Sequence, residues 1–287
     1  MSPVVKEFFD RPTFTYSYVV HCPETKHCAI IDSVLDFDYA SGSTSTKMAD
    51  QILDYITANG LIADLILETH VHADHLSAAP YLQKKTGGRM AIGDHITVVQ
   101  EVFGKAFNEG TGFQRDGSQF DLLLKDNDTF SLGNIACQAM HTPGHTPACM
   151  SYLIGDAVFV GDTLFMPDYG TARCDFPGGD ARVLFNSIHR LYQLPEATRM
   201  YMCHDYGAPG REGFKFETTV GEEKYHNIHV NMDTPEDQFV EMRTNRDATL
   251  DMPRLILPSV QVNMRAGHLP PAEDNGQVYL KIPVNLF

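Results

Sequence analysis

The stretch "LILETHVHADHLSAAP", residues 65–80, decides the fold, because three histidines and an aspartate follow directly on an apolar run. Residues 64–69 predict a buried strand that leads into this polar turn. Residues 76–88 predict a helix that ends at two consecutive glycines. We therefore expect a turn between a strand and a helix that carries four side chains able to bind metal.

The four polar side chains of this turn suit metal ions. Alternate residues of an extended chain point the same way, so His70 and His72 can share one target. Asp74 and His75, past the bend, can reach a second nearby point. Imidazole suits zinc and iron, and a carboxylate adds a charged ligand. The ordinary alternative is a polar helix cap with surface histidines, but three histidines within six residues favour the metal site.

Three later pieces of the sequence each offer one more candidate ligand at the end of a strand-like run. In "HTPGHTPA" the glycine and prolines make a sharp turn that carries His145. "VFVGDTLF" places Asp162 after a buried-looking strand, and "MCHDYG" ends such a strand with His204. Taken singly, these residues could be a turn histidine, a helix cap and a core histidine. Their order favours one shared site, because side chains at the ends of separate strands can converge.

Composition limits the partners and the compartment. Lys and Arg total 22 against 37 Asp and Glu, a net charge of −15, which argues against nucleic acid and anionic membranes as partners because like charges repel. We read no signal peptide and no apolar run of membrane-spanning length. The six cysteines form no C-x-x-C pair, which predicts reduced thiols and a cytoplasmic protein.

The alternation of strand-like and helix-like runs predicts an α/β protein in which helices cover sheets. We expect one domain over residues 1–230. Beyond it the chain becomes irregular and rich in proline, as in "MPRLILPSVQV". Residues 231–287 are therefore expected to form a C-terminal extension packed on the same domain.

The ordered set T-H-V-H-A-D-H, then G-H, G-D and H-D, resembles the metallo-β-lactamase superfamily over roughly residues 14–230. This resemblance implies a four-layer αβ/βα sandwich with metal held between the sheet edges, but membership alone does not choose a reaction. The stretches "ARCDFPGGDA", "TVGEEKYHN" and "VNMRAG" look like those of the persulfide dioxygenases, also called sulfur dioxygenases. Glyoxalase II thioester hydrolases share most of the earlier pieces.

The resemblance to persulfide dioxygenases implies one Fe(II) per chain, held by His70, His145 and Asp162. Two histidines and one carboxylate leave open coordination positions for substrate and O2. The implied reaction is oxidation of glutathione persulfide by O2 and water to sulfite and glutathione. The other polar residues of the motifs would then orient the ligands through hydrogen bonds. These are His72, Asp74, His75 and His204.

Two alternatives stay open. In a dinuclear zinc hydrolase similar to glyoxalase II, the same residues would complete two zinc sites, with Asp162 bridging the ions; the residue types do not separate the two interpretations. A third hypothesis is a sulfur- or redox-sensing protein that binds its ligand without turnover. The complete set of ligands argues against that hypothesis.

Glutathione carries two carboxylates and one ammonium group, so its site needs cations and polar donors. Arg173 offers a planar fork for a carboxylate or for charge near sulfur. Tyr206 could donate a hydrogen bond to the bound sulfur or to O2. Arg211, Lys215 and Lys224 are candidates for the glycine carboxylate, although each could also be a solvated surface cation.

The residues on either side of Arg173 in the sequence are Ala172 and Cys174. Ala172 departs from the family resembled, in which glycine commonly precedes the arginine. Cys174 could relay a persulfide, but we expect a structural thiol. Similar family members also suggest a homodimer, with the proline-rich C-terminal stretch at the subunit contact.

Overall fold

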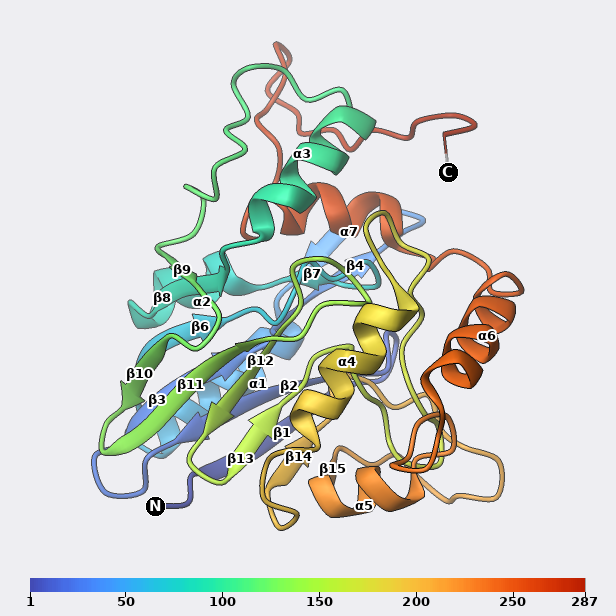
Figure 1. The fold of residues 1–287 in the computed structure, drawn as a ribbon. Coiled ribbons are helices and arrows are strands. Elements are labelled where there is room, and N and C mark those ends of the chain that lie inside the picture. The colour runs from blue at the N-terminus through green and yellow to red at the C-terminus, as the bar shows by residue number, and fades with distance from the viewer. Residues whose placement is uncertain (287) are drawn as a thin grey trace.

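The computed structural model describes residues 1–286 and contains two six-stranded sheets with helices on both outer sides (Figure 1). This arrangement confirms the four-layer αβ/βα sandwich. In spatial order, the first sheet contains β1 (Val4–Asp10), β2 (Thr15–His21), β3 (His27–Ile31), β6 (Ile62–Leu67), β8 (Arg89–Gly93) and β9 (Leu122–Leu124). The second contains β10 (Thr129–Leu132), β11 (Ile135–His141), β12 (Met150–Ile154), β13 (Ala157–Phe159), β14 (Arg199–Tyr201) and β15 (Glu217–Thr219).

The helices and a small third sheet complete the layers. The helices whose apolar residues pack on the first sheet are α1 (Lys47–Ala58), α2 (Ala79–Thr86), α3 (Ile96–Ala106) and α7 (Ile256–Asn263). Those on the side of the second sheet are α4 (Ala181–Leu191), α5 (Val220–His226) and α6 (Glu236–Asp247). The small sheet has the order β5 (Ser43–Ser45), β4 (Val34–Asp38) and β7 (Leu76–Ser77).

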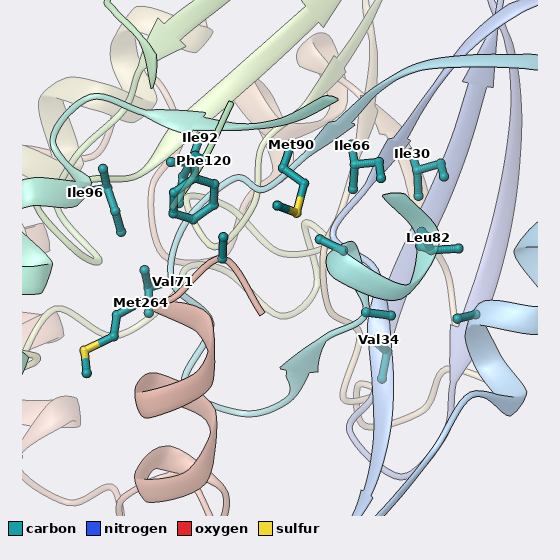
Figure 2. Close-up of a cluster of buried hydrophobic side chains, with 14 of the residues drawn as sticks. Ile30, Val34, Ile66, Val71, Leu82, Met90, Ile92, Ile96, Phe120 and Met264 are labelled. Carbon is teal, nitrogen blue, oxygen red and sulfur yellow. The ribbon is translucent and has the colours of Figure 1, made fainter. Parts of the chain in front are cut away.

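Alternation along the strands explains why two cores form. Successive side chains of a strand point to opposite faces, so one set packs on the helices and the other on the facing sheet. Ile30 and Ile66 belong to the helix-side core, whereas Ile31 and Leu67 belong to the core between the sheets. Figure 2 shows Ile30 and Ile66 beside Met90, all facing the helix that carries Leu82. The central strands are apolar on both faces for this reason.

The turn of residues 65–80 folds largely as expected. Strand β6 ends at Leu67, and α2 ends at Gly87, whose φ of 77° is readily adopted by glycine. The predicted helix starts later than expected, because Leu76 and Ser77 pair with β4 before α2 begins. This pairing anchors the far side of the polar turn to the small sheet.

The expectation of an irregular chain after residue 230 is wrong for two segments, because α6 and α7 are helical. Helix α6 buries Phe239 together with Arg243 and Asp247, so its buried stripe carries little apolar signal. Helix α7 contains Pro258 in its first turn, where the missing N–H costs nothing.

Helices α6 and α7 both pack against the rest of the molecule, α6 on α4 and α7 beside β7. The boundary at residue 230 between domain and extension stays a prediction. No helix within residues 1–286 combines the length and apolar character that a bilayer crossing requires.

Candidate metal centre

Side chains from four segments meet at one edge of the sandwich. His70 follows β6, His145 follows β11, Asp162 follows β13, and His204 follows β14. All four are buried, with exposed fractions between 0% and 7%. The structure therefore brings together the residues that the sequence placed at strand ends.

A glycine allows Asp162 to reach this edge. Gly161 has a φ of 52°, a left-handed conformation that glycine adopts without the penalty of a Cβ. A Cβ at this position would lie 2.6 Å from Oγ1 of Thr69, which is closer than van der Waals contact allows. The turn after β13 thus depends on glycine to bring Asp162 beside the loop that carries the histidines.

The outer nitrogens of three imidazoles hydrogen-bond to backbone carbonyls. His145 Nδ1 donates to the carbonyl oxygen of Arg173 at 2.7 Å, and His75 Nδ1 donates to that of the following residue at 3.2 Å. His204 Nδ1 lies 3.3 Å from the carbonyl oxygen of Phe14. A neutral imidazole that donates through Nδ1 carries a lone pair at Nε2, so these bonds select the tautomer that can bind metal.

Asp32 fixes the other two imidazoles. The Thr69 hydroxyl donates to Asp32 Oδ2 at 2.9 Å, so its oxygen accepts from His70 Nδ1 at 3.0 Å. His72 Nε2 donates to Asp32 Oδ1 at 3.0 Å. His70 is therefore left with a lone pair at Nε2, and His72 is left with Nδ1 as the ring atom that has no partner among the described residues.

The remaining donor atoms are buried and face one another. Within residues 1–286, Nε2 of His70, Nδ1 of His72 and Nε2 of His204 have no hydrogen-bond partner. Oδ2 of Asp162 lies 3.6 Å from Nε2 of His145 and 4.0 Å from that of His70. Lone pairs this close and this well shielded from water need a cation between them. The residues present therefore fit a bound metal ion.

The donor atoms form two sets that share Asp162. His70, His145 and Asp162 offer atoms that all lie within 4.8 Å of one another. On the other side, His204 Nε2 lies 3.3 Å from Asp162 Oδ1 and 3.2 Å from Asp74 Oδ2. His75 Nε2, also without a partner among the described residues, adds a donor to this second set. Nitrogen and carboxylate donors suit both iron and zinc.

Burial controls the protonation of these imidazoles. Burial and then the neighbouring imidazoles hold the pKa of His70 well below its ordinary value, and burial is the main cause that lowers the pKa of His75 to about 3. Burial also acts to lower the pKa of His72, but the carboxylates of Asp32 and Glu68 outweigh it and raise that pKa. The first two imidazoles therefore stay neutral at physiological pH and keep their lone pairs.

A cavity of about 390 Å³ opens onto the centre, a volume in the range of small-molecule sites. Asp74, His145 and Asp162 lie at its metal end. One wall is aromatic, and its rings contact one another. These residues are Phe14, Phe165, Tyr169 and Tyr206.

Tyr206, the predicted hydrogen-bond donor, lines the aromatic wall of this cavity. Its ring stacks on that of His204, with centroids 5.6 Å apart and planes 17° apart, and 39% of the residue is exposed. Desolvation and then the carboxylates of Asp74 and Asp162 raise the pKa of Tyr206 well above its ordinary value. The phenol therefore keeps its proton and can donate a hydrogen bond into the cavity.

Arg173 also lines the cavity, but its fork is occupied. Asp175 accepts from Nε and from Nη2 of Arg173, each at 2.6 Å, and the carbonyl oxygen of Asp251 accepts from Nη1 at 2.7 Å. The guanidinium stacks over Phe176 at 5.2 Å. Ala172 has no positive φ, so its backbone does not require the glycine of the family resembled.

The structure does not bring the other predicted substrate cations to this cavity. Arg211 forms a doubly hydrogen-bonded ion pair with Asp205 and is only 7% exposed in its side chain. Lys224 pairs with Glu196, and Lys215 is exposed; none of the three lines the cavity. Their role in substrate binding stays a prediction that this geometry does not support.

Cys174 is buried, as a structural thiol would be. Its backbone N–H donates to Asp247 at 2.8 Å, and burial raises the pKa of its thiol. A protonated, buried thiol is a poor nucleophile. This environment agrees with the structural role that we expected.

Some residues that support the centre from a distance could not be recognised in the sequence. Asn263 in α7 donates from Nδ2 to the carbonyl oxygens of His72 at 2.9 Å and His75 at 2.7 Å. The "VNMRAG" stretch was the only signal for it, and its role could not be read from the motif. Asp32 follows an apolar strand, as Asp162 does, so the same rule could have found it. Arg246 and Arg254 line the cavity without any distinguishing signal in the sequence.

Comparison with known proteins agrees with this geometry. A probable metallo-hydrolase of Burkholderia pseudomallei (strain 1710b) is 58% identical over 98% of this chain and 99% of the relative. Glyoxylase B2 of Dictyostelium discoideum is 48% identical over 98% and 97%. The human mitochondrial persulfide dioxygenase ETHE1 is 28% identical over 92% and 89%.

A solved structure and a family profile complete the comparison. The crystal structure of ETHE1 from Myxococcus xanthus superposes with a TM-score of 0.73 at 29% identity, and covers 92% of this chain and 100% of that one. The profile of the metallo-beta-lactamase superfamily matches residues 10–204, the part that carries every predicted metal ligand. The chain therefore belongs to the metallo-beta-lactamase superfamily.

Proposed function

We propose that this chain is an iron-dependent persulfide dioxygenase that converts glutathione persulfide, O2 and water into sulfite and glutathione. For a neutral persulfide, one O2 and one water give one sulfite dianion, one thiol and two protons. The terminal sulfur is oxidised and O2 is reduced. The S–S bond breaks, and the inner sulfur leaves as the thiol.

One observation carries this proposal: His70, His145 and Asp162 gather their donor atoms at the end of a cavity large enough for a small thiol. Two histidines and one carboxylate are the ligands of many non-haem iron oxygenases. The similarity to human persulfide dioxygenase over 92% of the chain supports the choice of substrate.

The three residues would hold one Fe(II), which supplies a redox-active centre where a sulfur anion and O2 can exchange electrons. The Arg173 carbonyl orients His145, and Asp32 orients His70 through the Thr69 hydroxyl. The Tyr206 phenol donates a hydrogen bond to the anionic sulfur. The aromatic wall keeps water from the reacting atoms.

Metal analysis and oxygen uptake on one preparation test the proposal. The purified protein is expected to contain about one iron per chain and to consume O2 when glutathione persulfide is added. Sulfite should appear in proportion to the O2 consumed. Iron-loaded protein that consumes no O2 with this substrate would end the proposal.

A dinuclear zinc thioester hydrolase is the second candidate, favoured by the position of Asp162 between two ligand sets. A carboxylate that faces both sets can bridge two ions, and Asp74, His75 and His204 could complete the second site. The relative named glyoxylase B2 points the same way. About two zinc ions per chain and cleavage of S-lactoylglutathione would establish this candidate instead.

We further propose that the enzyme acts as a homodimer in the cytoplasm, as the family resembled and the reduced thiols suggest. Sedimentation of the purified protein at several concentrations tests the first point. Fractionation of cells that express the full chain tests the second.

A further inference from the structure

Arg246 and Arg254 differ from most arginines of this chain. Eight of the twelve arginines hold hydrogen bonds or ion pairs with other residues, most of them to carboxylates. Within residues 1–286, neither Arg246 nor Arg254 has a side-chain hydrogen bond or ion pair, and both are exposed. Both also line the cavity above the metal centre. Two guanidinium groups that form no hydrogen bond or ion pair within residues 1–286 thus line one cavity in a protein with a net charge of −15, although Arg254 lies near enough to Asp38 to help lower the pKa of that carboxyl.

The segment that carries them is firmly held. Arg243 and Asp247 in α6 form a buried ion pair, and Arg243 also donates to the carbonyl oxygen of Thr171 at 3.1 Å. Arg173 donates to the carbonyl oxygen of Asp251. The end of α6 and the loop that follows it are therefore fixed to the same segment that orients His145, so the backbone that carries the two arginines has a defined place relative to the predicted metal ligands.

A carboxylate lies between the two arginines in the sequence and lines the same cavity. Asp251 is exposed, and within residues 1–286 its side chain has no hydrogen bond or ion pair. The cavity mouth therefore offers two cations and one anion that are not already paired. A ligand with two carboxylates and one ammonium group carries the complementary charges, two negative and one positive.

We propose that Arg246, Asp251 and Arg254 form a substrate-recognition site that binds the zwitterionic tail of a sulfur substrate, with the two arginines binding its carboxylates and Asp251 its ammonium group. The planar guanidinium fork matches a carboxylate in two hydrogen bonds, which gives direction as well as strength. This assignment rests on the proposed function for one point only, namely that the sulfur of the substrate lies at the metal centre. The same tail occurs in glutathione persulfide, glutathione and glutathione thioesters.

Calorimetric titration of the purified, metal-loaded protein with glutathione tests this site without turnover. Arg246→Gln and Arg254→Gln should each raise the Kd for glutathione about tenfold. The matched control is Arg89→Gln, which removes an exposed arginine that does not line this cavity and should leave the Kd unchanged. Equal Kd values for wild type, Arg246→Gln, Arg254→Gln and the control would overturn the proposal. The absence of glutathione binding to wild type would overturn it as well.

The direction in which Asp251→Asn changes the Kd for glutathione distinguishes specific recognition of the ammonium group from general attraction of anions. If the mouth merely attracted anions, Asp251→Asn would strengthen binding, because it removes a negative charge. Under our proposal it weakens glutathione binding several-fold and has no effect on N-acetylglutathione, which lacks the ammonium group. Tighter binding of glutathione by Asp251→Asn would overturn the role of this carboxylate.

The glycine ethyl ester of glutathione lacks the glycine carboxylate. Binding of this ester therefore shows which arginine pairs with that carboxylate. Wild type should bind this ester more weakly than glutathione. The arginine variant that has lost the partner of that carboxylate should bind both compounds alike. If both arginine variants discriminate as strongly as wild type, neither residue binds the glycine carboxylate and the two-arginine assignment fails.

Turnover distinguishes a failure of this site from a failure of the dioxygenase proposal. In an active dioxygenase, each arginine variant should lower about tenfold the ratio of kcat/KM for glutathione persulfide to kcat/KM for a small uncharged persulfide, mainly through KM. Protein that binds glutathione as described but consumes no O2 would keep this recognition site and overturn only the oxidation. An unchanged ratio in an active enzyme would overturn the site and keep the oxidation.

Discussion

Oδ1 of Asp32 lies 3.0 Å from Nε2 of His72, and both side chains are buried. The carboxylate holds the imidazole through Nε2, so that Nδ1, which has no hydrogen-bond partner among the described residues, is the atom left on the side of the metal centre. Asp32 also accepts from the Thr69 hydroxyl, so one carboxylate fixes two histidines. Partners of this kind commonly control metal affinity although they do not touch the ion.

Asp32→Asn should therefore weaken metal binding about 10- to 100-fold while the fold is retained. The amide keeps the shape of the carboxylate but not its charge. Competition with a chelator of known affinity measures the change. Asp64→Asn is the control, because Asp64 also pairs with a histidine, His27 at 2.8 Å, but on the partly exposed surface. Equal affinity in both variants would mean that Asp32 does not support the centre.

Substitution of single ligands should separate one-metal from two-metal binding. His70→Ala, His145→Ala and Asp162→Ala should each remove the proposed iron and the activity, because each deletes one of its three proposed ligands. His204→Ala should leave much of the metal bound. Metal content by mass spectrometry checks these outcomes. A His204→Ala protein that loses half of a two-metal content would favour the dinuclear zinc enzyme.

Asn263→Ala should destabilise the protein by about 2–3 kcal/mol, because it leaves the buried carbonyls of His72 and His75 without donors. The side chain also accepts from the backbone N–H of Ser77 at 2.8 Å, and this bond is lost as well. Urea unfolding measures the difference. Asn134→Ala, at an exposed asparagine that bonds only to a surface glutamate, should change the stability by less than about 0.5 kcal/mol.

Breaking the buried pair of Arg243 and Asp247 should cost about 3–5 kcal/mol of unfolding free energy, since either single substitution leaves an uncompensated buried charge. Lys105 and Glu101 form a pair at the same helical spacing, but both are exposed, and breaking it should cost less than about 1 kcal/mol. Double-mutant cycles on the two pairs provide the comparison. Similar coupling energies in both pairs would contradict the role of burial.

Glu223 should make stability fall as pH rises. Burial raises the pKa of this carboxyl well above its ordinary value of 4.5, and Oε1 has no hydrogen-bond partner among the described residues. The folded state therefore keeps a proton that the unfolded chain releases near pH 4.5, so stability is full below that pH and is lost as pH rises toward the folded pKa.

Glu223→Gln removes this titration, so its stability advantage over wild type should grow with pH above about 5. Urea unfolding at a series of pH values measures it. Glu222→Gln, at an exposed neighbour, should run parallel to wild type. If Glu223→Gln also runs parallel, the carboxyl is ionised in the folded protein.

The motifs of the sequence were sufficient, through the family they resemble, for the fold, and they identified residues that gather at one sheet edge, for a physical reason. A ligand at the end of an apolar strand is marked locally, so His70, His145 and Asp162 could each be found within a few residues of a strand. Strand ends converge in an α/β sandwich, which joins such local signals into one site.

The support behind the histidine loop and the cations that line the cavity could not be predicted, because their determinants are not local. Asn263 is 191 residues from His72, and no pattern near either residue marks the contact. Arg246 and Arg254 look like any surface arginines in the sequence, while Arg211 and Lys224, the predicted partners of the glycine carboxylate, pair with carboxylates of the protein itself. The position of a cation in the sequence was thus a poor guide to whether it lines the cavity.

The outer nitrogens of five imidazoles at the centre already have hydrogen-bond partners, and this arrangement links metal binding to the stability of the protein. Their inner nitrogens face the centre before any ion arrives; His70 and His75 are neutral there, whereas the raised pKa of His72 keeps a proton that a bound cation would displace. An ion that binds the folded chain and not the unfolded one adds its binding energy to folding. Removal of the metal should accordingly lower the stability of the folded chain as well as end its reaction.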